Sequence, residues 1–65
     1  MRIELNGEAR EVRSLRLSEA LAELGFGEAA VATAVNGAFV PAAARGERAL
    51  AEGDRLEVLA PRQGG

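Results

Sequence analysis

The hydrophobic and charged residues at the start of the chain alternate one by one over residues 1–5. A period of two is typical of a strand with one buried face. Asn6-Gly7 follows, and this dipeptide is the strongest short-range signal for a two-residue hairpin turn. A second, polar-rich strand is expected over residues 8–13, with Val12 as its clearest inward residue. The sequence therefore predicts an N-terminal β-hairpin.

The spacing of the apolar residues becomes helical in the next segment. Four of them recur at intervals of three and four along one face, namely Leu17, Ala20, Leu21 and Leu24. Glu19 and Glu23 fall on the opposite face, and Gly25 is placed to end the helix in a left-handed C-cap. Ser14 and Ser18 are the two candidate N-caps. A helix of about eight residues is marginal in isolation, so its apolar face is expected to pack on the sheet.

Residues 27–36 are open to two interpretations. Their alanines favour a helix by propensity. Val31, Thr33 and Val35, however, alternate with alanines and lead into a second hairpin signal, Asn36-Gly37. We therefore favour a strand, a turn and another strand.

The fourth predicted strand is short, because Phe39-Val40 is followed at once by Pro41. Proline has no N–H group to donate to a ladder, so this strand is expected at an edge or a break of the sheet. Phe39 is one of two phenylalanines, and we expect its ring in the core rather than at an interface. The same expectation holds more firmly for Phe26.

The remaining residues predict a loop, a turn and a last strand. Residues 42–51 are rich in alanine and charge and are expected to form a connecting loop, with one turn of helix around Leu50. Residues 52–54 are Glu-Gly-Asp, a tight-turn signal, and residues 55–59 then alternate into a strand that Pro61 ends. The order predicts an α+β roll, a mixed sheet of about five strands with one main helix packed on one face. The first and last strands are expected to be parallel neighbours in the middle of the sheet.

Composition narrows the range of functions. Sixty-five residues allow one domain, near the lower size at which a core is self-sufficient. A net charge of −2 argues against a nucleic-acid binder, which would show a basic patch. Without cysteine there are no disulfides or thiolate metal sites. No apolar run approaches the ~20 residues of a membrane span, and no secretory signal is visible, so we expect a cytoplasmic protein.

The residues that usually carry catalysis are missing as well, since the chain has no His, Lys, Tyr or Trp. Acid–base or covalent chemistry would depend on carboxylates, arginines, Ser14, Ser18 or Thr33. A serine nucleophile would lack His or Lys as its base, and the acids are spread singly among arginines, as on a solvated surface. We therefore expect no catalytic residue, no bound metal and no bound cofactor. A substrate, a carrier or a binding module fits this composition better than an enzyme.

The sequence given ends in Gly64-Gly65. Two glycines form a thin and conformationally permissive backbone, which suits a tail that threads a narrow channel and presents its terminal carboxylate. A frayed end that happens to contain glycine is the simpler alternative. We expect a folded body over residues 1–60 and a tail over residues 61–65.

In its order of elements and its Gly-Gly ending, the chain resembles the ubiquitin-like sulfur carriers over essentially all its residues. Residues 35–41, Val-Asn-Gly-Ala-Phe-Val-Pro, are similar to the Asn-containing stretch ending in Val-Pro of the ThiS family of thiamine biosynthesis. Leu50 with residues 52–56 is similar to the Gly-Asp turn before the last strand of that family. The family often has Arg after the proline, where this chain has Ala42, which puts a role for a cation at that position in doubt. The resemblance implies a ubiquitin-like β-grasp fold.

The resemblance also implies a sulfur carrier for thiazole formation. In the family, an E1-like adenylyltransferase (ThiF) uses ATP-Mg to adenylate the terminal glycine, and sulfur derived from cysteine then displaces AMP. The thiocarboxylate donates its sulfur to thiazole synthase (ThiG). On this chain Gly65 would carry the modification, while Gly64, Gln63 and Arg62 would form the tail inside the partner's channel.

Three alternatives stay open at this point. The chain could serve molybdopterin synthase or tRNA thiolation as a carrier of the same shape. It could be a ubiquitin-like protein modifier, although the absence of lysine excludes lysine-linked chains built on itself. It could also be a plain interaction module whose glycines are incidental.

Overall fold

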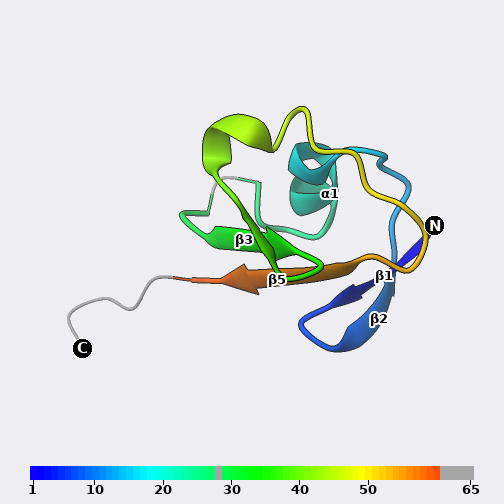
Figure 1. Cartoon of the computed structure of the whole chain (residues 1–65). Helices are drawn as coiled ribbons and strands as arrows, with labels where there is room; N and C mark the ends of the chain where they lie inside the picture. Colours follow the sequence, from blue (N-terminus) through cyan, green and yellow to red (C-terminus); the bar gives the residue numbers. More distant parts are fainter. Residues whose placement is uncertain (28, 61–65) are drawn as a thin grey trace.

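The computed structural model describes residues 1–27 and 29–60. In chain order its elements are β1 (Arg2–Leu5), β2 (Glu8–Glu11), α1 (Leu17–Glu23), β3 (Ala32–Val35), β4 (Ala38–Val40), a 3-10 turn η1 (Ala42–Ala44) and β5 (Arg55–Leu59). Figure 1 shows these elements along the chain. The predicted order of strands and helix is confirmed, with the strand interpretation of the segment before Asn36.

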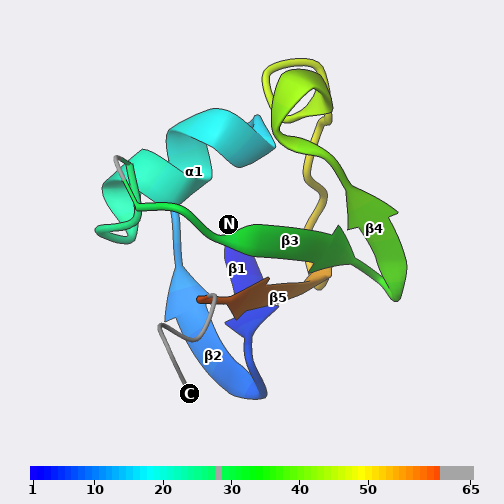
Figure 2. The same cartoon turned by 90° about the vertical axis from the view of Figure 1, so that its left-hand side faces the viewer.

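The five strands form one mixed sheet in the order β2-β1-β5-β3-β4. β1 and β5 are parallel, and the other neighbouring pairs are antiparallel. Figure 2 shows α1 on one side of this sheet, with β2 and β4 at its two ends. The α+β roll, the parallel pair of first and last strands and the edge position of the fourth strand are all as predicted.

The core lies between α1 and the sheet and consists of aliphatic side chains. Its buried members are Ile3, Leu5, Val12, Leu17, Ala20, Leu21, Val35, Val40, Leu50, Leu56 and Val58. Phe26 packs partly buried against this cluster, as predicted. Each fully buried Leu, Ile or Val contributes about 1.5–3 kcal/mol to stability. Most of this gain offsets the conformational entropy lost on folding, so a small core leaves little net stability when hydrogen bonds are lost.

Phe39 is not in the core, which corrects the expectation from its size. Its side chain is 69% exposed, whereas Val40 beside it is buried. The two-residue turn pairs Val35 with Ala38 and Thr33 with Val40, so Phe39 falls on the alternate face of the strand. Register, rather than hydrophobicity, therefore decides which way this ring points.

The segment after Pro41 also differs from the prediction. The helical turn lies at Ala42–Ala44, directly after the proline, and not around Leu50. Leu50 is buried in an extended stretch, where its N–H donates to the Leu15 carbonyl at 2.9 Å. Pairing with the segment before α1 holds this part of the chain extended, which local propensity does not reveal.

Helix α1 begins without a side-chain cap. Arg16 occupies the N-cap position, and neither Ser14 nor Ser18 caps the helix. The first N–H groups of the helix donate instead to the main-chain carbonyls of Arg48 at 2.9 Å and Arg45 at 3.1 Å. Carbonyls from a distant segment thus satisfy the donors that a capping serine would otherwise bind.

The C-terminal end of α1 follows the predicted glycine cap. Gly25 has a φ of +99°, and its N–H donates to Ala22 at 3.1 Å. The N–H of Phe26 donates to Leu21 at 2.7 Å, which completes a Schellman motif. This motif turns the chain so that Phe26 packs back on the core.

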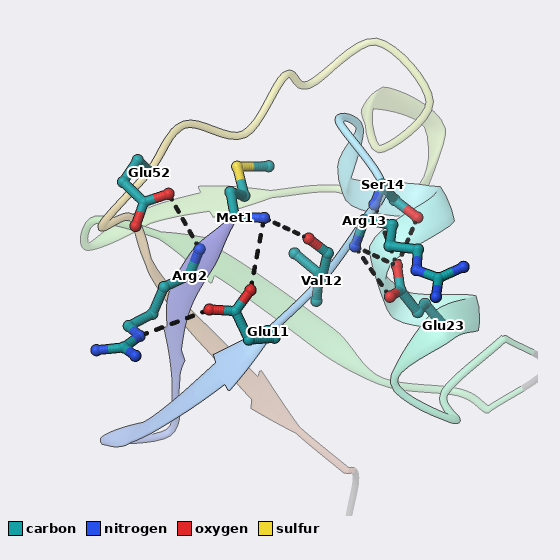
Figure 3. A network of polar contacts seen from close by, with 8 residues as sticks. All are labelled: Met1, Arg2, Glu11, Val12, Arg13, Ser14, Glu23 and Glu52. Carbon is teal, nitrogen blue, oxygen red and sulfur yellow. Dashed lines mark hydrogen bonds and ion pairs between the residues drawn. The ribbon is translucent and has the colours of Figure 1, made fainter.

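Glu23, predicted only as an outward residue, ties the end of α1 to the loop before it. Its carboxylate accepts hydrogen bonds from the Arg13 N–H at 2.9 Å and from the N–H and hydroxyl of Ser14 at 3.1 and 2.8 Å (Figure 3). The Arg13 N–H, followed by the Ser14 hydroxyl, holds the pKa of Glu23 below its ordinary value of 4.5. The carboxylate is therefore ionised at neutral pH and anchors the loop.

Candidate functional site: strand β5 and the surface around its end

The residues predicted to carry the chemistry, Gly65, Gly64, Gln63 and Arg62, lie outside the described residues. The structure describes the strand that leads to them, β5, as far as Leu59 and then Ala60. β5 is central, because β1 and β3 pair with its two sides. β1 pairs with Arg55 and Leu56 at the start of the strand, whereas β3 pairs with it as far as Leu59, where the chain leaves the sheet.

The Asn6-Gly7 turn fastens the later part of β5. Both residues have positive φ, 50° and 88°, which is the type I′ geometry that the dipeptide predicts. The Asn6 side chain donates to the Val58 carbonyl at 3.1 Å and accepts from the Val58 N–H at 2.9 Å. The side-chain amide thus acts as one more peptide group and extends the parallel ladder of β1 toward the end of β5.

The Asn36-Gly37 turn fastens the beginning of β5 in a related way. Its φ values, 51° and 84°, match those of the first turn. The Asn36 side chain accepts from the Arg55 N–H at 2.9 Å and donates to Asp54 Oδ1 at 3.0 Å. The two segments that carry the family resemblance, residues 35–41 and 52–56, therefore meet here.

Sequence reasoning placed both turns correctly but missed what their asparagines do to β5. The available signal is the residue type, because an amide offers a donor and an acceptor on separate atoms and asparagine also tolerates positive φ. Aspartate or glycine would make an equally good turn and would not bind both groups of a neighbouring strand.

Asp54 is a carboxylate that hydrogen bonds hold within the fold. The Asn36 amide is the main cause that holds the pKa of Asp54 below its ordinary value of 3.8. The Ala51 N–H, 2.8 Å from Asp54 Oδ2, and the charge of Arg48 act in the same direction, against partial desolvation. The group is ionised at neutral pH and fixes the turn that starts β5.

An apolar strip crosses the face of the sheet opposite α1, next to the end of β5. It consists of Leu59 on β5, Ala32 and Ala34 on β3, and Phe39 on β4. The register pairs Leu59 with Ala32 and Ala34 with Phe39, so the four side chains share one face. Leu59 and Phe39 are 68% and 69% exposed. We call this set the open-face strip.

Part of the open-face strip can be predicted from the sequence. Leu59 has the same parity in the strand as Arg55 and Glu57, which are both exposed, so parity alone places it outward. Large exposed apolar side chains that lie near one another mark contact surfaces. This surface begins at the last residue of β5 and therefore adjoins the predicted tail.

The acidic side chains of the described residues do not form a cluster. Within residues 1–27 and 29–60, no group of three or more His, Cys, Asp or Glu side chains is placed to hold a metal ion. The two carboxyl groups with shifted pKa values, Glu23 and Asp54, are both lowered and both bound within the fold. None of the helices described is long and apolar enough to span a membrane.

The comparisons with known proteins agree with this arrangement. The sequence model of the ThiS family matches residues 3–65. Among solved structures, the chain is similar to one described as the thiamine biosynthesis protein ThiS from Geobacter metallireducens. The two share 28% identity over 100% of each chain, with a TM-score of 0.84. The comparison with curated proteins finds no match. The β-grasp fold and the resemblance expected from the sequence are thereby confirmed, and the chain belongs to the ThiS family.

Proposed function

We propose that this chain is a sulfur carrier for thiazole formation in thiamine biosynthesis, with the Gly65 carboxylate as the group that is modified. Membership of the ThiS family and the likeness to a thiamine biosynthesis protein support the pathway. The observation that carries the mechanism is the clamped central strand β5, which leads directly toward the Gly-Gly end. A fixed strand before a thin end suits the presentation of a carboxylate to another protein.

The chemistry requires activation, because a C-terminal carboxylate has a pKa of about 3.5 and is a poor electrophile at neutral pH. In the proposed first step, a carboxylate oxygen of Gly65 attacks the α-phosphorus of ATP and pyrophosphate leaves, giving an acyl adenylate. Sulfide (HS⁻) then attacks the acyl carbon, AMP leaves, and the S–H proton is lost to water. The product is a thiocarboxylate whose sulfur is passed to the thiazole precursor.

The proposal divides this work between the carrier and its partners. An E1-like adenylyltransferase (ThiF) would bind ATP-Mg and form the adenylate, and a cysteine-derived donor would supply sulfur. Thiazole synthase (ThiG) would consume the thiocarboxylate. The carrier itself would supply no catalytic residue and bind no cofactor or metal. The open-face strip gives these cytoplasmic partners a contact surface beside the tail.

The test is conversion of the purified chain with the adenylyltransferase encoded in the same genome, ATP-Mg and a sulfide source. Intact-mass analysis should show one oxygen replaced by sulfur at the last residue. Deletion of Gly65 should abolish the change, and Gly64→Val should impair it severely, because a β-branched side chain widens and stiffens the tail. A Gly65-deleted chain that still gained sulfur would exclude the proposal.

The acceptor is tested separately, by offering the thiocarboxylate to thiazole synthase. Transfer to tRNA or to a molybdopterin precursor instead would move the chain to another carrier role. Conjugates on lysines of other proteins would identify a modifier.

A further inference from the structure

The sheet has two edges, β2 and β4, and both follow an Asn-Gly turn. A two-residue turn closes on a hydrogen-bonded pair, so the next pair in each hairpin is not hydrogen-bonded. That next pair is Glu4 with Ala9 in one hairpin and Ala34 with Phe39 in the other. The backbone N–H and C=O groups of Ala9 and of Phe39 therefore point away from the sheet, at matching positions of its two edges.

Charged side chains line the β2 edge. All four residues of β2 are exposed, and three of them are charged. Arg10 lies 3.6 Å from Glu8. Arg2 on β1 lies 3.8 Å from Glu11, a pair that Figure 3 shows. Charges along an edge strand oppose the addition of another strand.

The β4 edge has no such protection. Its three residues, Ala38, Phe39 and Val40, carry no charge, and the Phe39 ring is 69% exposed. An apolar edge with outward-facing backbone groups is a template for strand pairing. In this sheet the template lies on one edge only.

A shallow and open groove lies beside the β4 edge, with a volume of about 350 Å³. It is lined by Ala38, Phe39, Val40, Pro41, Ala44, Glu47 and Arg48. Among the described residues, Arg48 makes no ion pair, and its buried Nε has no hydrogen-bond partner. Glu47 lines the same groove and the charge of Arg48 lowers the pKa of Asp54, but neither carboxylate makes a direct ion pair with Arg48. An acidic side chain of a partner at this groove would supply that direct, charge-assisted contact.

We propose that the free edge of β4 binds an extended segment of the partner adenylyltransferase, which adds a strand to the sheet and places an acidic side chain beside Arg48. This proposal rests on the proposed function. Strand addition supplies main-chain hydrogen bonds for affinity, and a flanking groove supplies side-chain selectivity.

The adenylyltransferase is the occupant that the chemistry favours. A terminal glycine looks the same on any chain that ends in one, so selection before ATP is consumed must come from the body of the carrier. β4 lies two strands from β5, or about 10 Å, so an added strand would sit on the same sheet as the tail-bearing strand. The Phe39 ring also belongs to the open-face strip, so the edge and that surface form one continuous contact.

The direct test is amide hydrogen exchange by NMR on the full chain, alone and with the adenylyltransferase. The Phe39 amide should exchange about tenfold more slowly in the complex, the size expected from a newly formed hydrogen bond. The Ala9 amide, at the matching position of the other edge, is the internal control and should not change. Slower exchange at Ala9 alone would overturn the proposal, as would Phe39 protection that grows with carrier concentration when no partner is present.

The charge is tested with Arg48→Gln against the matched edge variant Arg10→Gln. Arg48→Gln should weaken binding to the adenylyltransferase about tenfold, as expected for one charge-assisted hydrogen bond, with thermal unfolding unchanged. Arg10→Gln should bind as the native chain does. Unchanged Phe39 exchange with normal adenylation would overturn edge pairing and leave the proposed function standing. Absence of both complex and adenylation would overturn the two together.

Discussion

The two hairpins of the sheet share one turn and differ in almost everything around it. Each has Asn-Gly with nearly equal φ values, 50° and 88° in the first and 51° and 84° in the second. Each asparagine amide binds β5. The first hairpin ends in a charged edge strand, however, and the second in an apolar one. The turn thus sets the geometry of a hairpin, whereas the flanking residues decide what the hairpin can contact.

The asparagines differ in their surroundings as well. The hydrogen bonds of Asn6 to Val58 are partly buried, whereas those of Asn36 to Asp54 and Arg55 are exposed. Water replaces a lost exposed hydrogen bond more easily than a buried one. The same residue type in the same turn should therefore contribute unequally to stability.

The largest effect is expected for Asn6→Gly. Glycine keeps the positive φ and removes only the amide, so both backbone groups of Val58 lose their partner. The free energy of unfolding should fall by about 2 kcal/mol, measured by urea denaturation. Asn6→Ala should lower it by about a further 1 kcal/mol, because alanine resists the left-handed conformation. If Asn6→Gly and Asn36→Gly lowered the free energy of unfolding equally, the two turns would not differ in their contribution to stability.

Asn36→Gly should have a smaller effect, about 1 kcal/mol in the same assay. The Arg55 N–H and the Asp54 carboxylate regain water when the amide is removed, since both hydrogen bonds are exposed. Asn36→Ala separates the turn conformation from the amide, as in the first hairpin. A loss above that of Asn6→Gly would show that the start of β5, and not its later part, is the critical attachment.

Phe39→Ala should change the free energy of unfolding by only about 0.5 kcal/mol, as surface substitutions do. The same substitution of a phenylalanine in the core would lower the free energy of unfolding by about 3–5 kcal/mol. Val40→Ala, on the buried side of the same strand, is the matched control and should destabilise more. A large loss at Phe39 would return its ring to the core and contradict the exposed edge.

The smallest effects concern the two carboxyl groups with lowered pKa values, and they are expected only at acidic pH. Asp54 belongs to the second hairpin's junction with β5, and Glu23 holds the loop after the first hairpin. Both pKa values are lower in the folded state, so their contribution is present above the ordinary values of 3.8 and 4.5 and is lost as pH falls through the folded ones.

Unfolding followed between neutral pH and about pH 3 should therefore show a smaller decline for Asp54→Asn and for Glu23→Gln than for the native chain. A native chain that became more stable in acid would contradict the lowered pKa values.

Local signals made much of this fold predictable. Asn-Gly fixed two turns, alternation placed β1 and β5, and Gly25 ended the helix. The open-face strip was half predictable, because parity exposes Leu59 but the size of Phe39 suggested burial.

Several of the missed features depend on partners far apart in the chain. Asn6 lies 52 residues from Val58, and the first turn of α1 is capped by carbonyls beyond residue 44. Leu50 is extended because it pairs with Leu15. No window of neighbouring residues contains such information, so these contacts emerge only once the sheet has formed.

The parallel pairing of β1 and β5 has a mechanical consequence. Under the proposed function, a partner that binds the end of the chain would pull along β5, which pairs with β1 at Arg55 and Leu56 and with β3 over residues 56–59. Force in this direction loads the hydrogen bonds in shear, all at once, rather than opening them one after another. The Asn6 amide adds two hydrogen bonds to those under load, both at Val58 near the end of β5. β5 could thus bear tension applied by a partner at the end of the chain while the rest of the domain stays folded.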